Sequence, residues 1–256
     1  MGLDVYVGTL TRYYSGDWEL ITQRVGRELG LTVEVVRQDD HSEALTDPNE
    51  IRPMIEHWQS SIGPALGIDA RWDEADVQPY FTDKPDWDGY WGMLFLAGAV
   101  ANPTLAVPDV WPDHPERSPL VQITHKRHGL LRRKGPPESG SRFWCLRVPT
   151  VWLPWEFDGM WHGRFPSGET LTVGSVSELN TQLRMLATDL GASDDTLTVW
   201  EEAIGQPLGE EIIVDGQVLE RFERSAPLEA GRRGLAMFIR LAALAAEHRL
   251  PLRLDY

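Results

Sequence analysis

Two carboxylates and a histidine lie close together in the second half of the chain, where they could perform acid–base chemistry. Glu156 and Asp158 are two residues apart, so on a strand both side chains would point to one face. Trp155 and Trp161 flank them, and an aromatic wall around two acids is the arrangement that glycoside cleavage uses. His162 could act as a general base. These residues predict one function, a hydrolase site in a tryptophan-lined cleft. On a solvated loop the same acids would have no catalytic role.

Tryptophan is unusually frequent, with 11 residues in a chain of 256. Large indole rings concentrate at recognition surfaces because they bury much area while the N–H finds a partner, although core packing is the alternative. Acidic residues accompany the rings, above all between residues 67 and 91. We therefore expect a contact surface of rings and acids, completed by two arginines. Its candidate residues are Tyr13, Tyr14, Trp72, Tyr80, Asp86, Trp87, Asp88, Trp91, Trp155, Arg132 and Arg133.

The charge of the chain is divided unevenly. The formal net charge is −15, which opposes generic binding to nucleic acid or anionic membranes and favours basic partners. The segment 125–147 carries seven Lys and Arg residues against one acid, a net charge of +6, which leaves −21 for the remainder. This basic segment could hold an anionic ligand or the acidic surface of another copy. The alternative is a charged loop that keeps a sheet edge soluble.

The common signatures of metal and cofactor sites are missing. The chain contains no GxxxxGK[ST], GxGxxG, HExxH, CxxC or GxSxG pattern, so the sequence predicts neither a metal nor a cofactor. Its single cysteine, Cys145, follows a tryptophan and precedes a leucine, which favours a packed thiol. His125 and His128 flank two basic residues, whose charge would oppose binding of a cation.

A stretch near residues 88–101 is the element around which the others must be arranged. From Tyr90 onward it is apolar on every side, which predicts a helix surrounded by protein, and it is too short to span a membrane. Asp86 or Asp88 could cap this helix, and Asn102-Pro103 would end it. Its small residues, Gly92 and Gly98 among them, would let neighbouring elements approach closely.

Strands and helices alternate around this helix without a regular βαβ repeat. Period-two alternation and short β-branched or apolar runs predict strands at 3–10, 32–36, 120–124, 143–153 and 250–256, and hairpins at 160–173 and 212–219. For 212–219 a continuation into helix is the alternative. Helical spacing and caps predict helices after Ser15 to Gly30, after Asp47 with a kink or delayed start at Pro53, and over 176–190, 194–204 and 226–248. We expect an α+β fold with a mixed, largely antiparallel sheet and helices packed on it.

The chain is predicted to form a single domain over residues 1–256, with a possible subdomain boundary in the proline-rich segment 102–119. Its N-terminus lacks the charged and apolar regions of a secretory signal, which favours a cytoplasmic protein. The opening MGLDVYVGTLTRYYSGDW, the segment YFTDKPDWDGY and the closing LPLRLDY resemble those of a group of bacterial proteins of unassigned function. The resemblance runs over most of the chain. It implies a bacterial protein and no catalytic residues.

Three functions follow from these patterns. The leading one is a cytoplasmic binding protein whose acidic, tryptophan-rich surface engages a basic partner protein or a small ligand, such as an antidote to a basic toxin or enzyme. The alternative is the hydrolase described above. The third is an assembly protein whose basic segment docks on the acidic face of another copy.

Overall fold

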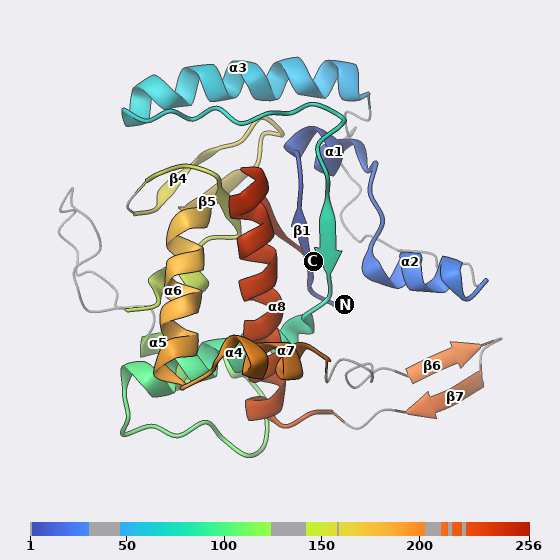
Figure 1. Cartoon of the computed structure of the whole chain (residues 1–256), viewed down its shortest axis with the longest axis vertical. Coiled ribbons are helices and arrows are strands. Elements are labelled where there is room, and N and C mark those ends of the chain that lie inside the picture. Colours follow the sequence, from blue (N-terminus) through green and yellow to red (C-terminus); the bar gives the residue numbers. More distant parts are fainter. Residues whose placement is uncertain are drawn as a thin grey trace. The chain divides into compact units, whose positions relative to one another are not determined.

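The computed structural model describes residues 2–30, 47–123, 142–157, 159–202, 211–214, 217–221 and 224–256. These residues form eight α-helices and a six-stranded mixed sheet that is mostly antiparallel, so the predicted α+β fold with helices packed on the sheet is confirmed (Figure 1). The chain divides into two compact units. Unit 1 comprises Met1–Lys84, Val148–Asn180 and Leu241–Tyr256, and unit 2 comprises Pro85–Arg147 and Thr181–Arg240.

Unit 1 contains the six-stranded sheet, in the order β2-β1-β8-β3-β5-β4. Its strands are β1 (Asp4–Val7), β2 (Phe81–Asp83), β3 (Val151–Leu153), β4 (Trp161–Arg164), β5 (Thr170–Ser175) and β8 (Leu252–Asp255). Only β3 and β5 pair in parallel; the other neighbours are antiparallel. The predicted hairpin over 160–173 and the terminal strand are confirmed. The C-terminal strand therefore lies inside the sheet, between β1 and β3.

Helices cover this sheet in unit 1. They are α1 (Leu10–Ser15), α2 (Ile21–Glu28) and α3 (Pro48–Leu66), and α6 (Val176–Asp189) and α8 (Pro227–His248) also contribute residues 176–180 and 241–248. Leu10 of α1 and Ile51 and Ile55 of α3 pack with Val151 of β3 in one core. As predicted, α3 begins after Asp47, whose carboxylate accepts a hydrogen bond of 2.9 Å from the Asn49 N–H.

Four details of unit 1 differ from the sequence prediction. The first strand ends at Val7, because the Thr9 hydroxyl caps α1 by accepting from the Arg12 N–H. The stretch between residues 67 and 85, where the sequence indicates no strand, contains the short strand β2, whose partner is β1. α3 runs through Pro53 without the delayed start that the sequence predicts as the alternative to a kink. Val25 of α2 and Leu29, which follows the helix, are exposed, although helical spacing in the sequence predicts one apolar stripe that contains both.

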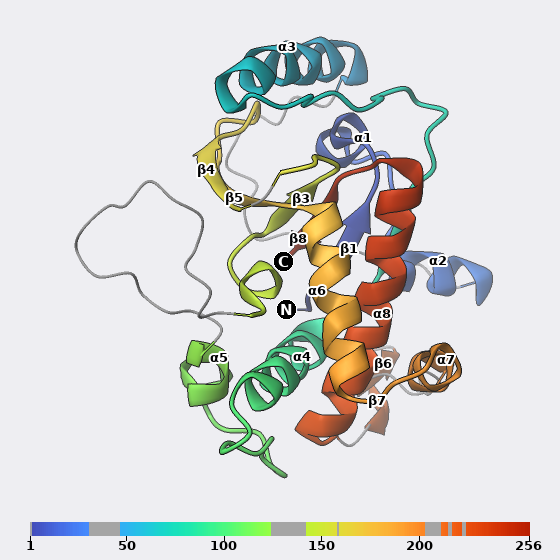
Figure 2. The same ribbon diagram turned by 60° about the vertical axis from the view of Figure 1, so that its left-hand side comes forward.

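Unit 2 is organised around α4 (Asp86–Ala101), in which nine residues are buried, as expected for a helix that is apolar all round (Figure 2). Its other elements are α5 (Pro119–Ile123), α7 (Asp194–Glu202), β6 (Glu211–Val214), β7 (Gln217–Arg221), most of α6 (Val176–Asp189) and α8 (Pro227–His248), and the 3₁₀ turns η1 (Pro115–Arg117) and η2 (Trp144–Leu146). A side chain at Gly92 would collide with the backbone of Gly231, so the two helices cross in direct contact.

Three further predictions are wrong. Residues 119–123 form the helix α5, because the Ser118 carbonyl accepts the first helical N–H groups and Pro119 suits the start of a helix. The expected strand over 143–153 is reduced to β3, since η2 occupies its first half. Neither Asp86 nor Asp88 is the N-cap of α4; Pro85 holds that position, and both acids lie in the first turn.

Several predictions concern residues outside the described ones: the strand 32–36, the residues 125–141 of the basic segment, and the turn Asp215-Gly216, although its flanking strands pair as predicted. The proline-rich segment 102–119 lies within unit 2.

Candidate functional site

The predicted catalytic residues do not form a described site. Glu156 and His162 are both exposed, and Asp158 lies outside the described residues. His162, on β4, contacts the Thr172 hydroxyl across the hairpin at 3.0 Å. A general acid that works near neutral pH needs an apolar environment. Glu156 has no such environment, because its side chain is exposed.

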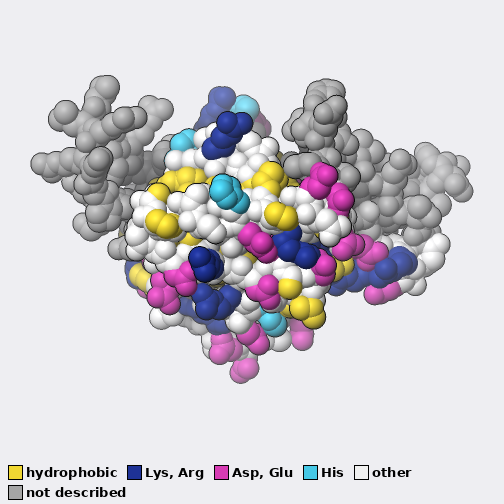
Figure 3. All heavy atoms as spheres, turned by 90° about the horizontal axis from the view of Figure 1, so that it is seen from above, with side chains coloured by type: hydrophobic (Ala, Val, Ile, Leu, Met, Phe, Trp, Pro, Cys, Tyr) yellow, Lys and Arg dark blue, Asp and Glu magenta, His cyan; other side chains and the backbone are white. Residues whose placement is uncertain are grey.

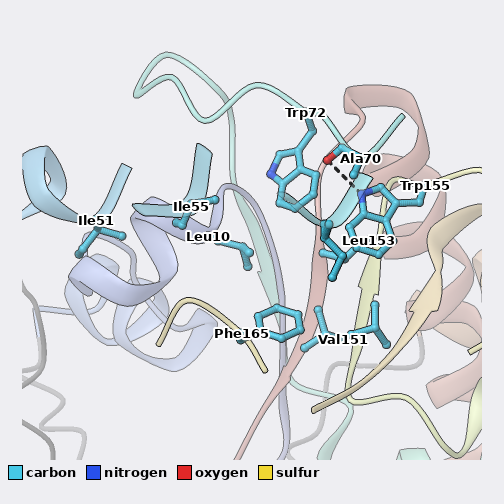
Figure 4. Packing of buried hydrophobic residues seen from close by; sticks show 11 residues of the cluster. Leu10, Ile51, Ile55, Ala70, Trp72, Val151, Leu153, Trp155 and Phe165 are labelled. Carbon is cyan, nitrogen blue, oxygen red and sulfur yellow. Dashed lines mark hydrogen bonds between the residues drawn. The ribbon is translucent and has the colours of Figure 1, made fainter. Parts of the chain in front are cut away.

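Trp72 and Trp155 belong to the core of unit 1 and not to a contact surface. They are 7% and 1% exposed, respectively. Figure 4 shows their rings beside Leu153, with the Trp155 Nε1 donating to the carbonyl oxygen of Ala70 at 3.2 Å. The Trp72 Nε1 donates to Glu74. Because each indole N–H has a partner inside the protein, full burial carries no unsatisfied donor.

Glu74 is a buried carboxylate that fixes the start of α1. It accepts hydrogen bonds from the backbone N–H groups of Leu10, at 3.1 Å, and Thr11, at 2.7 Å. Burial raises the pKa of Glu74 above its ordinary value, and these hydrogen bonds oppose the rise. The side chain thus links the 67–80 loop to α1, which is a structural role.

Tyr13 and Tyr14 are engaged in a polar network within unit 1. Arg253 of β8 is 9% exposed. Its guanidinium donates to Glu169 at 3.0 and 3.2 Å and to the Tyr14 hydroxyl at 3.1 Å, and it lies 4.3 Å from the centre of the Tyr13 ring. The Tyr13 hydroxyl donates to Asp255 at 2.6 Å. Both tyrosines are partly buried, and their hydroxyl groups form hydrogen bonds within the protein. They therefore offer a partner few polar groups.

The pKa shifts in this network result from burial and from the positive charge of Arg253. Burial raises the pKa of Tyr13 and of Tyr14, and Arg253 opposes both shifts. Burial also tends to raise the pKa of Glu169, but its hydrogen bonds with Arg253, Ser167 and Tyr14 outweigh this and hold the pKa below its ordinary value. Glu169 is therefore ionised at neutral pH.

Tyr80 closes a second aromatic group in unit 1. Its ring stacks on Tyr6 with centres 6.5 Å apart, and the Arg12 guanidinium lies 5.1 Å from its centre. Tyr80 is partly buried. Its ring faces are thus used within the protein, which argues against the predicted contact role.

The first two turns of α4 in unit 2 bring together four more of the predicted contact residues. Trp87 and Trp91 are one helical turn apart, and their rings stack with centres 5.9 Å apart and planes 18° apart. Both are partly exposed, as are Asp86 and Asp88 on the same turn. Two indoles and two carboxylates therefore share a solvent-accessible helix end.

This helix end already binds a guanidinium. Arg224 donates from Nε and Nη2 to the two Asp88 carboxylate oxygens, both at 2.6 Å. Its guanidinium carbon also lies 4.6 Å from the centre of the Trp111 ring, while the Trp111 Nε1 donates to the Ser225 carbonyl. A carboxylate and an indole face are both groups that bind arginine well.

Two other features of the described surface belong to unit 1. A shallow hollow of about 360 Å³ lies in unit 1 at the end of α3, with Gln59, Asp69 and Arg71 among its lining residues. The face that α3 covers carries acidic and basic side chains interspersed with hydrophobic ones (Figure 3). The acidic excess of the chain is therefore not gathered on that face.

Sequence reasoning missed Glu74, Glu169, Arg224 and Arg253. The alternation of LPLRLDY could have indicated Arg253, since it places an arginine on a strand whose neighbours are leucines. Nothing local marks the other three as site residues, because each has a decisive partner between 63 and 155 residues away in the chain. Arg132 and Arg133 lie outside the described residues.

Comparisons with protein-family models, with curated proteins and with solved structures find no match to this chain. None of the helices that the structure describes combines the length and apolar character needed to cross a bilayer. Among the described residues, no group of three or more His, Cys, Asp and Glu side chains is arranged to hold a metal ion.

Proposed function

We propose that this chain is a binding protein for a basic partner protein and that the first two turns of α4 are its contact site. The site consists of Trp87, Trp91, Asp86 and Asp88. The observation that carries the proposal is the stacked, partly exposed indole pair beside carboxylates, one of which already holds an arginine. A partner's lysine or arginine would meet the same chemistry.

The energetics fit a basic partner. A cation over an indole face contributes about 0.5–2 kcal/mol, and an aromatic pair that loses its remaining contact with water supplies much of the affinity at an interface. The net charge of −15 would accelerate the encounter with a positively charged protein. An antidote that neutralises a basic toxic enzyme in a bacterial cytoplasm is the kind of protein that has these properties.

Capture from bacterial lysate tests the proposal. The tagged full chain, the double variant Trp87→Ala with Trp91→Ala, and the control Trp200→Ala are each incubated with lysate at low and high salt. Trp200 is also a partly exposed tryptophan of unit 2, but it lies on α7. We expect a basic protein that the wild type and the control retain at low salt, that the double variant loses, and that high salt weakens. Equal retention by all three chains would contradict the proposal.

A further inference from the structure

Arg233, on the unit 2 part of α8, has two unsatisfied guanidinium nitrogens. The residue is 8% exposed. Its Nε and Nη2 atoms are shielded from solvent and have no hydrogen-bond partner among the residues that the structure describes. Buried polar groups are nearly always hydrogen-bonded, because an unpaired donor costs about 1–3 kcal/mol and a charged one more. An arginine in such a place therefore indicates a missing acceptor.

The surroundings of Arg233 place it beside the first turn of α4. A side chain at Gly89 of α4 would come within 3.7 Å of the Ala230 carbonyl oxygen and within 3.4 Å of the Gly234 Cα, so this turn of α8 packs on α4. Burial lowers the pKa of Arg233, and the charges of Asp86, Asp88 and Glu229 oppose that shift. Arginine stays protonated in proteins, so the group is a cation.

The unpaired edge has the geometry of a carboxylate receptor. Nε and Nη2 are the two parallel donors with which Arg224 holds Asp88 at 2.6 Å. The same two atoms of Arg233 are the unpaired ones. A planar group with two acceptor oxygens satisfies such a fork, and carboxylate and phosphate both offer this. The neighbouring acids repel a doubly charged phosphate more strongly than a singly charged carboxylate.

We propose that Arg233 binds a ligand carboxylate side-on through its Nε and Nη2 atoms. This site goes beyond the proposed function, because its ligand group is acidic, whereas the site around Trp87 and Trp91 is proposed for basic groups. Since both donor atoms are closed to solvent in this structure, entry of the carboxylate requires neighbouring groups to move. Binding is accordingly expected to be slow.

An NMR titration tests the proposal. It uses the full-length protein with isotope-labelled arginine, and acetate is the probe. The Nε–H signal of Arg233 is identified by its loss in Arg233→Met, and acetate is added at constant ionic strength in exchange for chloride. We expect this signal to shift and saturate, while that of Arg224, whose carboxylate is already bound, stays in place. Acetate should also raise the Tm of the wild type and of the control Arg232→Met, but not of Arg233→Met.

Other results would overturn the proposal. They are an Nε–H signal that does not shift with acetate, a shift of equal size with chloride, and a larger shift with phosphate than with acetate. A signal that moves in Asp86→Asn and not with acetate would also do so, since Asp86 would then be the acceptor in solution. If Arg233→Met fails to fold, Arg233→Lys keeps the charge without the fork. Its acetate affinity should fall about tenfold or more, and an unchanged affinity would count equally against the site.

Discussion

Arg224 binds Asp88 through two hydrogen bonds of 2.6 Å, and the two residues are 136 positions apart in the chain. The pair ties the segment before α8 to the first turn of α4 within unit 2. The Asp88 side chain is 17% exposed and that of Arg224 49%. The hydrogen bonds of Asp88 and its charge raise the pKa of Arg224 against the effect of burial. The arginine therefore helps to fix the helix end on which Trp87 and Trp91 lie.

The coupling between these two residues can be measured with a double-mutant cycle of Asp88→Asn and Arg224→Met. Because Arg224 is half exposed and solvent screens the pair, we expect a coupling free energy of about 0.5–1 kcal/mol. Urea denaturation of the four proteins gives the value. Single-variant effects that simply add up would mean that the ion pair contributes nothing to stability.

Replacement of Trp155 by alanine should destabilise the protein by about 3–5 kcal/mol, because it leaves a cavity among packed aromatic rings. Its ring centre lies 5.9 Å from that of Trp58 and 6.2 Å from that of Trp72. Trp155→Phe, which keeps a ring but leaves the Ala70 carbonyl without its donor, should cost about 1–3 kcal/mol. Chemical denaturation measures both. A stability loss below 1 kcal/mol for the alanine variant would refute the placement of Trp155 in the core.

Glu74→Gln should lower stability by about 1–3 kcal/mol, since an amide has one acceptor oxygen where two backbone N–H groups and an indole N–H donate. Glu56→Gln, at an exposed position of α3, is the matched control and should change stability little. Thermal unfolding at neutral pH compares the two. Similar Tm values for both variants would show that Glu74 does not hold α1.

The pair of Glu169 and Arg253 predicts a pH dependence of stability. The pKa of Glu169 is lower in the folded protein than its ordinary value of 4.5. The carboxylate therefore binds fewer protons when folded, and its stabilisation is complete above pH 4.5 and is lost as the pH falls through the folded pKa. The Tm difference between the wild type and Glu169→Gln should be constant from pH 7 to about 5 and shrink below that. A difference that grows on acidification has the wrong sign for this pair.

The sequence predicts best those elements that local physics determines. A helix apolar on all sides must be buried, and α4 is. Residues 120–124 were misassigned because Val121 and Ile123 favour strands, while the start signal at Ser118-Pro119 had the stronger effect. The sequence could not show that Trp155 is buried whereas Trp91 is partly exposed, because this difference depends on a hydrogen-bond acceptor far away in the chain. The Ala70 carbonyl that satisfies Trp155 is 85 residues away.

The candidate site could be predicted only in part for the same reason. Asp86, Trp87, Asp88 and Trp91 are neighbours on one helix, so spacing alone brings them together. Arg224 and Arg233 come from the other end of unit 2, and only the packing of α8 on α4 places them nearby. Long-range contacts of this kind leave no local pattern in a single sequence.

The affinity of the full chain for the basic protein that it captures is the measurement that tests the contact site most directly. Calorimetric titrations compare the wild type, Trp87→Ala with Trp91→Ala, and Trp200→Ala. Loss of two rings from the centre of an interface costs about 2–4 kcal/mol, so we expect the double variant to bind roughly 30-fold to 1,000-fold more weakly. Trp200→Ala should bind like the wild type. Equal affinity of the double variant and the wild type would place the contact surface elsewhere on the molecule.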